Sequence, residues 1–233
     1  MPANAALSLR SHHQTAKDRN AMKIAIIGLG NIGSRVAKNL AAGGQSIIIS
    51  ERNLAKAQQL AGQLGGKAEV MPIDDAAKKA DVIVLAISFD AIKAFIATHH
   101  GAVAGKVVVD PSNPIAPDGK GGFKKIIPAE QSSGKIIAGL LPEGAELVKA
   151  FGTLRAESLV SAANRSPERA VLFYATDYPE AGRAVAKLII ASGFDPVSVG
   201  GIDQSIRIEV GGDLHELGKL GRPVSVKEAQ ALI

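Results

Sequence analysis

The sequence predicts an α/β protein, with a doubly wound parallel sheet followed by a smaller C-terminal α/β domain. From Met22 onward, short β-branched runs alternate with alanine-rich amphipathic segments. Near-continuous apolar runs such as DVIVLAI and KVVVD are typical of parallel strands that are buried on both faces. A glycine-rich turn also separates the first apolar run from the first amphipathic segment. Together these observations predict a sheet wrapped by helices.

The elements of the first unit follow in strict alternation. Its predicted strands are residues 23–28, 46–50, 67–71, 81–87 and 106–110. Its predicted helices are residues 31–42, 53–64, 74–79 and 90–98. A parallel sheet requires such crossover helices between consecutive strands, so the order itself supports this fold.

The alternation breaks between Pro111 and Gly144, which is rich in glycine and proline. One helix is predicted there, at about 132–141, with Ser132 or Ser133 as its N-cap. A connection of this length inside a compact domain is usually functional or disordered.

A second unit follows the strand expected in AELVKAFGTL. Its predicted elements are strands 169–175 and 196–199 and helices 178–192 and 203–217, with Gly193 ending the first of these helices. We therefore expect a disordered N-terminal extension (1–21), a dinucleotide-binding domain (22–150) and a small C-terminal domain (151–233) that completes a substrate cleft.

Composition excludes several classes of function. The 233 residues include no cysteine, so the chain has no thiol nucleophile or thiolate metal site. The net charge of +5 with only 3% aromatic residues favours a phosphorylated small molecule over nucleic acid. No apolar run approaches the roughly 20 residues that cross a bilayer. We expect no metal, no membrane or nucleic-acid partner, and a cytoplasmic location.

The glycine-rich turn has the spacing G-x-G-x-x-G, at Gly28, Gly30 and Gly33. In the dinucleotide-binding fingerprint the first glycine permits a tight turn, the second admits the pyrophosphate, and the third packs the helix against the strand. The unpaired amides of the helix N-terminus then face the phosphates. The turn predicts a Rossmann-type domain that binds a dinucleotide.

The residues after the second strand, ISERN, bear on which dinucleotide binds. A carboxylate here accepts a hydrogen bond from an NAD ribose, whereas an arginine meets the NADP 2′-phosphate. Glu51 and Arg52 supply one of each, with Ser50 as a neutral helper. We favour NADP and keep NAD possible; alternatively, Glu51 and Arg52 form a solvated ion pair at the strand tip.

Motifs along the chain extend this interpretation. In order they are the glycine turn, SERNLAKA, ADVIVLAISFDAI, VVVDPSNP, LVKAFGTL, DYPEAGRAVAKLIIASGFDPVSVGG and IRIE. With these motifs the sequence, from Met22 to Leu217, resembles the coenzyme F420-dependent NADP oxidoreductase family and its relatives, the cytosolic reductase domains of six-transmembrane metalloreductases. The late motifs are the more specific ones.

The resemblance implies a cleft in which the nicotinamide meets a deazaflavin or flavin ring. We also expect a small-molecule substrate and a homodimeric protein. The cofactor contacts that the resemblance implies are Asn31 and Ile32 in the turn, Ser50 and Arg52 at the adenosine end, Ile87, Ser88 and Phe89 beneath the cofactor, Asn113 and Pro114 after the fifth strand, and Ala150, Phe151 and Thr153 beside the nicotinamide. From their places in the turn and at the strand end we also expect Leu29 and Glu51 to contact the cofactor. The chain departs from the family at Glu51, where serine or threonine is usual, and at Gly152, where asparagine or histidine is frequent.

Hydride transfer between two redox rings requires no side-chain acid or base, so no catalytic residue is assigned. His215 is either a proton donor or a structural residue. Asp110 is either a base or the cap of the Ser-Asn-Pro turn, and Lys149 either approaches a phosphate or lies in solvent. Two alternative functions stay open: a non-catalytic NADP(H) redox sensor, or a reductase of a small imine or ketone.

Overall fold

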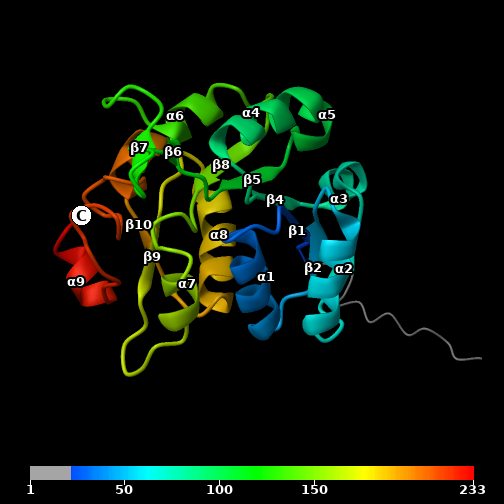
Figure 1. Ribbon diagram of the computed structural model, residues 1–233, viewed down its shortest axis with the longest axis horizontal. Coiled ribbons are helices and arrows are strands. Elements are labelled where there is room, and N and C mark those ends of the chain that lie inside the picture. Colours follow the sequence, from blue (N-terminus) through cyan, green and yellow to red (C-terminus); the bar gives the residue numbers. More distant parts are fainter. Residues whose placement is uncertain (1–21) are drawn as a thin grey trace, which may run out of the picture.

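The computed structural model describes residues 22–233, so the predicted N-terminal extension lies outside the described residues. Its main element is a six-stranded parallel sheet in the order β3-β2-β1-β4-β5-β8 (Figure 1). The strands are β1 (Ile24–Ile27), β2 (Ile47–Ser50), β3 (Ala68–Val70), β4 (Val82–Leu85), β5 (Val107–Asp110) and β8 (Glu146–Lys149). The order reverses between β1 and β4, which creates the crevice where ligands of doubly wound sheets bind. The predicted fold class is confirmed.

Helices cover both faces of this sheet, because its strands are apolar on both sides. Ile24 and Ile26 of β1 pack into one core cluster, and Ala25 and Ile27 pack into another. The first cluster includes side chains of α1 (Gly33–Ala42), α2 (Leu54–Gln63) and α8 (Pro179–Ala191). The second includes side chains of α3 (Ile73–Lys79), α4 (Phe89–Thr98), α5 (His100–Val103) and α6 (Ser133–Ala138).

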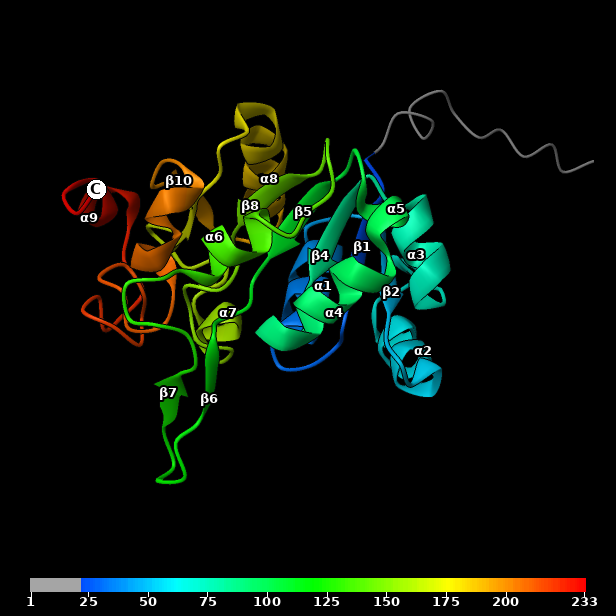
Figure 2. The same ribbon diagram turned by 90° about the horizontal axis from the view of Figure 1, so that it is seen from above.

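The glycine-rich connection after β5 contains more structure than the sequence predicts. Strands β6 (Ile115–Pro117) and β7 (Phe123–Lys125) form an antiparallel hairpin that projects from the body of the molecule (Figure 2). The predicted helix forms as α6, and the Ser132 hydroxyl accepts a hydrogen bond from the backbone N–H of Lys135. The chain then returns as β8, which pairs with β5 in parallel.

The C-terminal part begins with the short helix α7 (Ser158–Ser161) and forms a small parallel pair, β9 (Val171–Tyr174) and β10 (Asp195–Ser198). A bridge between Lys149 and Ala175 joins this pair to the large sheet. Helix α8 lies beside α1 (Figure 1) and ends, as predicted, before Gly193, whose φ is +90°. The first core cluster therefore continues from β1 to Phe194.

The expected helix 203–217 is wrong. The structure has a 3₁₀ helix (Ile202–Ile208) followed by turns, and a last helix α9 (Val226–Gln230). Gly211 adopts a φ of +89°, and a side chain on Gly212 would overlap the backbone carbonyls of Arg207 and Ile206. The chain folds back here instead of continuing as a helix, and this brings His215 to the cavity. No helix within residues 22–233 is long and apolar enough to cross a membrane.

Candidate active site

The three glycines of the turn have different steric surroundings. Gly28 has a φ of +92°, and a Cβ there would lie 2.5 Å from the Ile87 side chain. A Cβ on Gly33 would overlap the carbonyl oxygen of Gly28, so this glycine packs α1 against β1. A Cβ on Gly30 would meet nothing within 4 Å. The space over Gly30 is therefore open to a ligand.

The start of α1 leaves backbone donors free beside that space. No side chain caps the helix, and its first turn contains no acidic residue. Within residues 22–233, no hydrogen bond occupies the backbone N–H groups of Asn31 and Ile32. Unpaired amides at the positive end of a helix dipole suit a pyrophosphate. The turn thus fits the dinucleotide that the sequence predicts.

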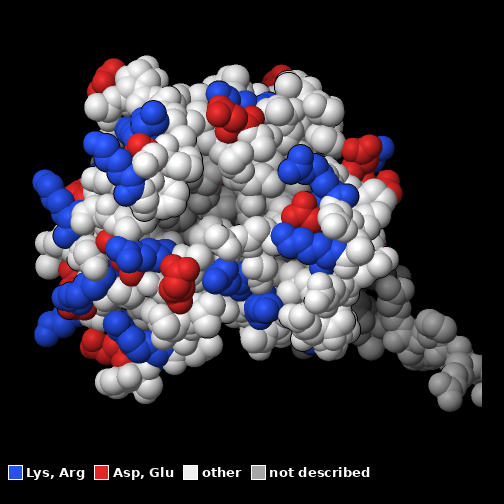
Figure 3. Space-filling model, in the orientation of Figure 1, with Lys and Arg blue, Asp and Glu red and all other residues white. Residues whose placement is uncertain are grey.

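One cavity of about 1270 Å³ extends from this turn to the projecting hairpin, and it appears as a hollow in the centre of the face in Figure 3. Nine predicted contacts line it: Gly28, Gly30, Asn31, Ile32, Glu51, Arg52, Ile87, Ser88 and Asn113. The other predicted contacts do not line it: Leu29, Gly33, Ser50, Phe89, Pro114, Ala150, Phe151 and Thr153.

The carboxyl end of β2 carries Glu51 and Arg52 into the cavity lining but turns Ser50 away. Ser50 is fully buried, and its hydroxyl donates to the carbonyl of Met71 at 2.8 Å. It therefore cannot assist a phosphate as proposed without losing that bond. Glu51 and Arg52 form no side-chain ion pair either, because Glu51 instead accepts the backbone N–H of Leu29 at 3.0 Å.

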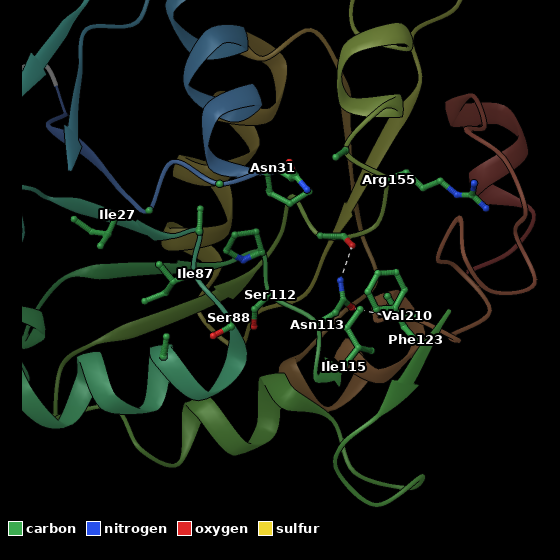
Figure 4. Close-up of a pocket in the computed structure, with 18 of the residues that line it drawn as sticks. Ile27, Asn31, Ile87, Ser88, Ser112, Asn113, Ile115, Phe123, Arg155 and Val210 are labelled. Atoms are coloured by element: carbon green, nitrogen blue, oxygen red, sulfur yellow. Dashed lines mark hydrogen bonds between the residues drawn. The ribbon is translucent and has the colours of Figure 1, made fainter. Parts of the chain in front are cut away.

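The loops after β4 and β5 bring two serines to the middle of the cavity. Ser88 and Ser112 both line the cavity, as does Ile87, and all three are labelled in Figure 4. The Ser112 hydroxyl is buried and has no hydrogen-bond partner among the described residues. Phe89 instead is buried in the core, with Lys93 Nζ 4.8 Å from its ring centroid.

Asn113 joins three segments at the floor of the cavity (Figure 4). Its side-chain amide donates to the carbonyl of Gly152 at 3.1 Å and accepts from the backbone N–H of Val210 at 2.7 Å. Asp110 caps the Ser-Asn-Pro turn, which was one of the two roles predicted for it. Its carboxylate accepts the backbone N–H of Ser112 at 2.7 Å. Asn113 therefore fixes this part of the site as well as lining it.

The segment expected beside the nicotinamide lies mostly behind the cavity wall. Ala150, Phe151 and Thr153 are each at most 1% exposed, and only Gly152 lines the cavity. Phe151 has a φ of +63°, which turns its ring into the core. A Cβ on Gly152 would lie 2.6 Å from the carbonyl oxygen of Pro111, which explains why this chain has no larger residue there.

His215 is buried against this segment and its ring nitrogens are both engaged. Nδ1 accepts from the backbone N–H of Leu217 at 2.8 Å, so Nε2 carries the proton that bonds to Gly152, also at 2.8 Å. Burial lowers the pKa of His215 from 6.5 to about 4, although the bond to Gly152 and nearby Glu216 oppose this. The imidazole is neutral near pH 7, and both of its ring nitrogens are bonded to backbone groups that hold the cavity wall together.

Lys149 is buried and does not line the cavity. Its Nζ donates to Asp110 at 2.8 Å, to the carbonyl of Ser112 at 2.5 Å and to the hydroxyl of Ser133 at 2.9 Å. Glu209, equally buried, accepts from the Ser133 hydroxyl and from the first amides of α6. This buried network supports the Ser112 turn from beneath.

The far end of the cavity was missed by the sequence analysis. It is apolar, and four of its side chains come from the hairpin and the C-terminal turns: Ile115, Phe123, Val210 and Leu217. Phe123 is 60% exposed, although it belongs to the lining of the cavity drawn in Figure 4. An exposed aromatic ring at a cavity mouth is typical of a binding surface, but the sequence alone does not show that Phe123 is exposed.

Comparison with known proteins agrees with this geometry. The family described as NADP oxidoreductase, coenzyme F420-dependent, matches residues 23–114. The F420-dependent NADP reductase of Methanothermobacter thermautotrophicus is 29% identical over 199 residues, which cover 81% of this chain and 85% of that protein. The N-terminal part of the chain therefore matches the coenzyme F420-dependent NADP oxidoreductase family.

Two further proteins are similar to most of the chain. A hypothetical protein from Sinorhizobium meliloti has a solved structure with a TM-score of 0.78 and 31% identity, covering 89% of this chain and 97% of that one. Metalloreductase STEAP3 of Rattus norvegicus is 29% identical over 82% of this chain. The chain spans only 36% of that metalloreductase. These matches relate the chain to NAD(P)-dependent oxidoreductases.

Proposed function

We propose that this protein transfers hydride between the nicotinamide of NADP(H) and a flavin or deazaflavin ring, coenzyme F420 being the acceptor that the family name suggests. The observation that carries this proposal is the form of the cavity. Its phosphate-binding end and its apolar end with Phe123 belong to one continuous space.

The size of the cavity supports two ligands. Pockets for one small molecule are commonly about 300–1,000 Å³, whereas this one is about 1270 Å³. The glycine turn and Arg52 suit the phosphates of a dinucleotide, and the far end offers an exposed ring and aliphatic side chains. A flat acceptor would stack on Phe123.

The reaction places few chemical demands on the side chains. When bound, the two cofactor rings supply the hydride donor and acceptor, and the protein must align them and exclude water. The Ser112 hydroxyl, buried and without a partner among residues 22–233, would hydrogen-bond a polar group of a bound ring, and Ser88 also lines the cavity. His215 keeps its proton on the Gly152 carbonyl, which argues against a small-ketone reductase that needs it as an acid.

The test is to mix the protein with NADPH and coenzyme F420, FMN or FAD under anaerobic conditions, and to follow the absorbance of both partners. Reduction of at least one ring acceptor, or the reverse reaction, is expected. Tight NADPH binding without turnover would support the sensor instead. Turnover confined to cyclic imines or ketones would support the small-substrate reductase.

A variant pair tests the proposed position of the acceptor. Phe123→Ala should raise the acceptor KM by about two- to ten-fold, the equivalent of one aromatic contact, and leave the KM for NADPH unchanged. Phe123→Tyr keeps the ring and should behave like the wild type. Equal acceptor KM values in all three proteins would contradict stacking on this hairpin.

A further inference from the structure

The two charged residues that follow β2 are held separately. Glu51 Oε1 accepts the backbone N–H of Arg52 at 2.9 Å, and Oε2 accepts the backbone N–H of Leu29 at 3.0 Å. Within residues 22–233 this carboxylate forms an ion pair with Lys56, whose Nζ lies 3.8 Å from Oε2. These bonds fix the Glu51 carboxylate on the glycine turn, within the lining of the cavity.

Arg52 is exposed and lines the same end of the cavity. Within residues 22–233 its guanidinium forms no ion pair and no hydrogen bond. It is therefore available to a phosphate, for which a planar bidentate donor is well suited.

The two side chains favour opposite cofactors. A carboxylate has about four acceptor positions, so Glu51 can still accept from a ribose diol after binding two amides. The same negative charge repels a 2′-phosphate, whereas Arg52 attracts it. A site that binds only NADPH gains nothing from a carboxylate beside the 2′-phosphate.

We propose that Glu51 is a specificity-determining residue that makes this protein accept NADH as well as NADPH, by accepting the 2′-hydroxyl of the NADH ribose. The proposal rests on the proposed function only for the placement of the dinucleotide on the glycine turn. It does not depend on the acceptor, and binding alone tests it.

The experiment measures the Kd of NADH and NADPH by titration calorimetry for the wild type, Glu51→Gln and Arg52→Ala. The wild type should bind both. Glu51→Gln keeps an oxygen for the Leu29 amide but removes the negative charge. NADPH should therefore bind more tightly and NADH more weakly, and the ratio of the two Kd values should change by about ten-fold or more. Arg52→Ala should weaken NADPH by more than about ten-fold with little effect on NADH.

Glu69→Gln is the matched control, because Glu69 lies on neighbouring β3, outside the cavity lining, paired with Lys79. Its Kd ratio should equal that of the wild type. If Glu51→Gln is poorly folded by circular dichroism, Glu51→Ser serves in its place. An unchanged ratio in the folded Glu51 variant overturns this proposal but leaves the proposed function intact. Failure of the wild type to bind either nucleotide overturns both.

Discussion

The imidazole of His215 donates a hydrogen bond from Nε2 to the carbonyl oxygen of Gly152, at 2.8 Å. The side-chain amide of Asn113 donates to the same oxygen. One backbone carbonyl thus connects the C-terminal turns, the segment after β8 and the loop after β5. The shape of the cavity floor depends on this junction.

The buried, neutral state of His215 predicts a loss of stability in mild acid. The unfolded chain takes up a proton near pH 6.5, whereas the folded chain resists until about pH 4. The free energy of unfolding should therefore be constant above pH 6.5 as far as this group is concerned, and fall by up to about 3 kcal/mol between pH 6.5 and 4. Urea unfolding at several pH values measures it.

The control for that prediction is His215→Gln, which retains a donor for Gly152 but does not titrate. Its stability should depend less steeply on pH over the same interval. Identical pH profiles for the two proteins would show that His215 does not cause the acid sensitivity.

Gly30 and Gly33 should respond oppositely to substitution by alanine. Gly30→Ala adds a methyl group to open space, so the variant should unfold like the wild type but bind NADPH at least ten-fold more weakly, roughly the effect of an obstructed pyrophosphate. Gly33→Ala forces its methyl group into the Gly28 carbonyl and should lower Tm markedly. Thermal unfolding and nucleotide titration separate these effects, and normal NADPH affinity in Gly30→Ala would refute the assigned role of that glycine.

Lys149 should stabilise the fold strongly, because its ion pair with Asp110 is buried. Lys149→Met leaves Asp110 buried without its partner and should cost about 3–5 kcal/mol. Neutralising both, with Lys149→Met and Asp110→Asn, should recover part of this loss, because asparagine still accepts the Ser112 amide. A double-mutant cycle by urea unfolding measures the coupling, and additive losses would contradict a direct pair.

Local patterns made the sheet and the glycine turn predictable from the sequence. The strands are β-branched runs of the right length, and the glycine spacing follows from steric demands that the structure confirms at Gly28 and Gly33. The hairpin was not predictable, since its strands have three residues each and no apolar alternation. The prediction of helix 203–217 was wrong because the backbone at Gly212 packs against the carbonyls of Arg207 and Ile206 and turns there. The pattern of apolar side chains does not reveal this contact.

The site was predictable only where it follows strand ends. Glu51, Arg52, Ile87, Ser88 and Asn113 line the cavity because parallel strands place their carboxyl ends at one edge. The segment after β8 was misplaced, since nothing local announces the positive φ that buries Phe151. Likewise, the sequence around Lys149 favours a solvated side chain. Its partner Asp110 is 39 residues earlier in the chain, and only the fold brings the two together.

The cavity is continuous from the glycine turn to Phe123. In the proposed reaction hydride passes directly from one ring to the other, so both ligands must occupy this space together. Initial-rate plots at several fixed acceptor concentrations should therefore intersect, as for a ternary complex, instead of running parallel as in a ping-pong scheme.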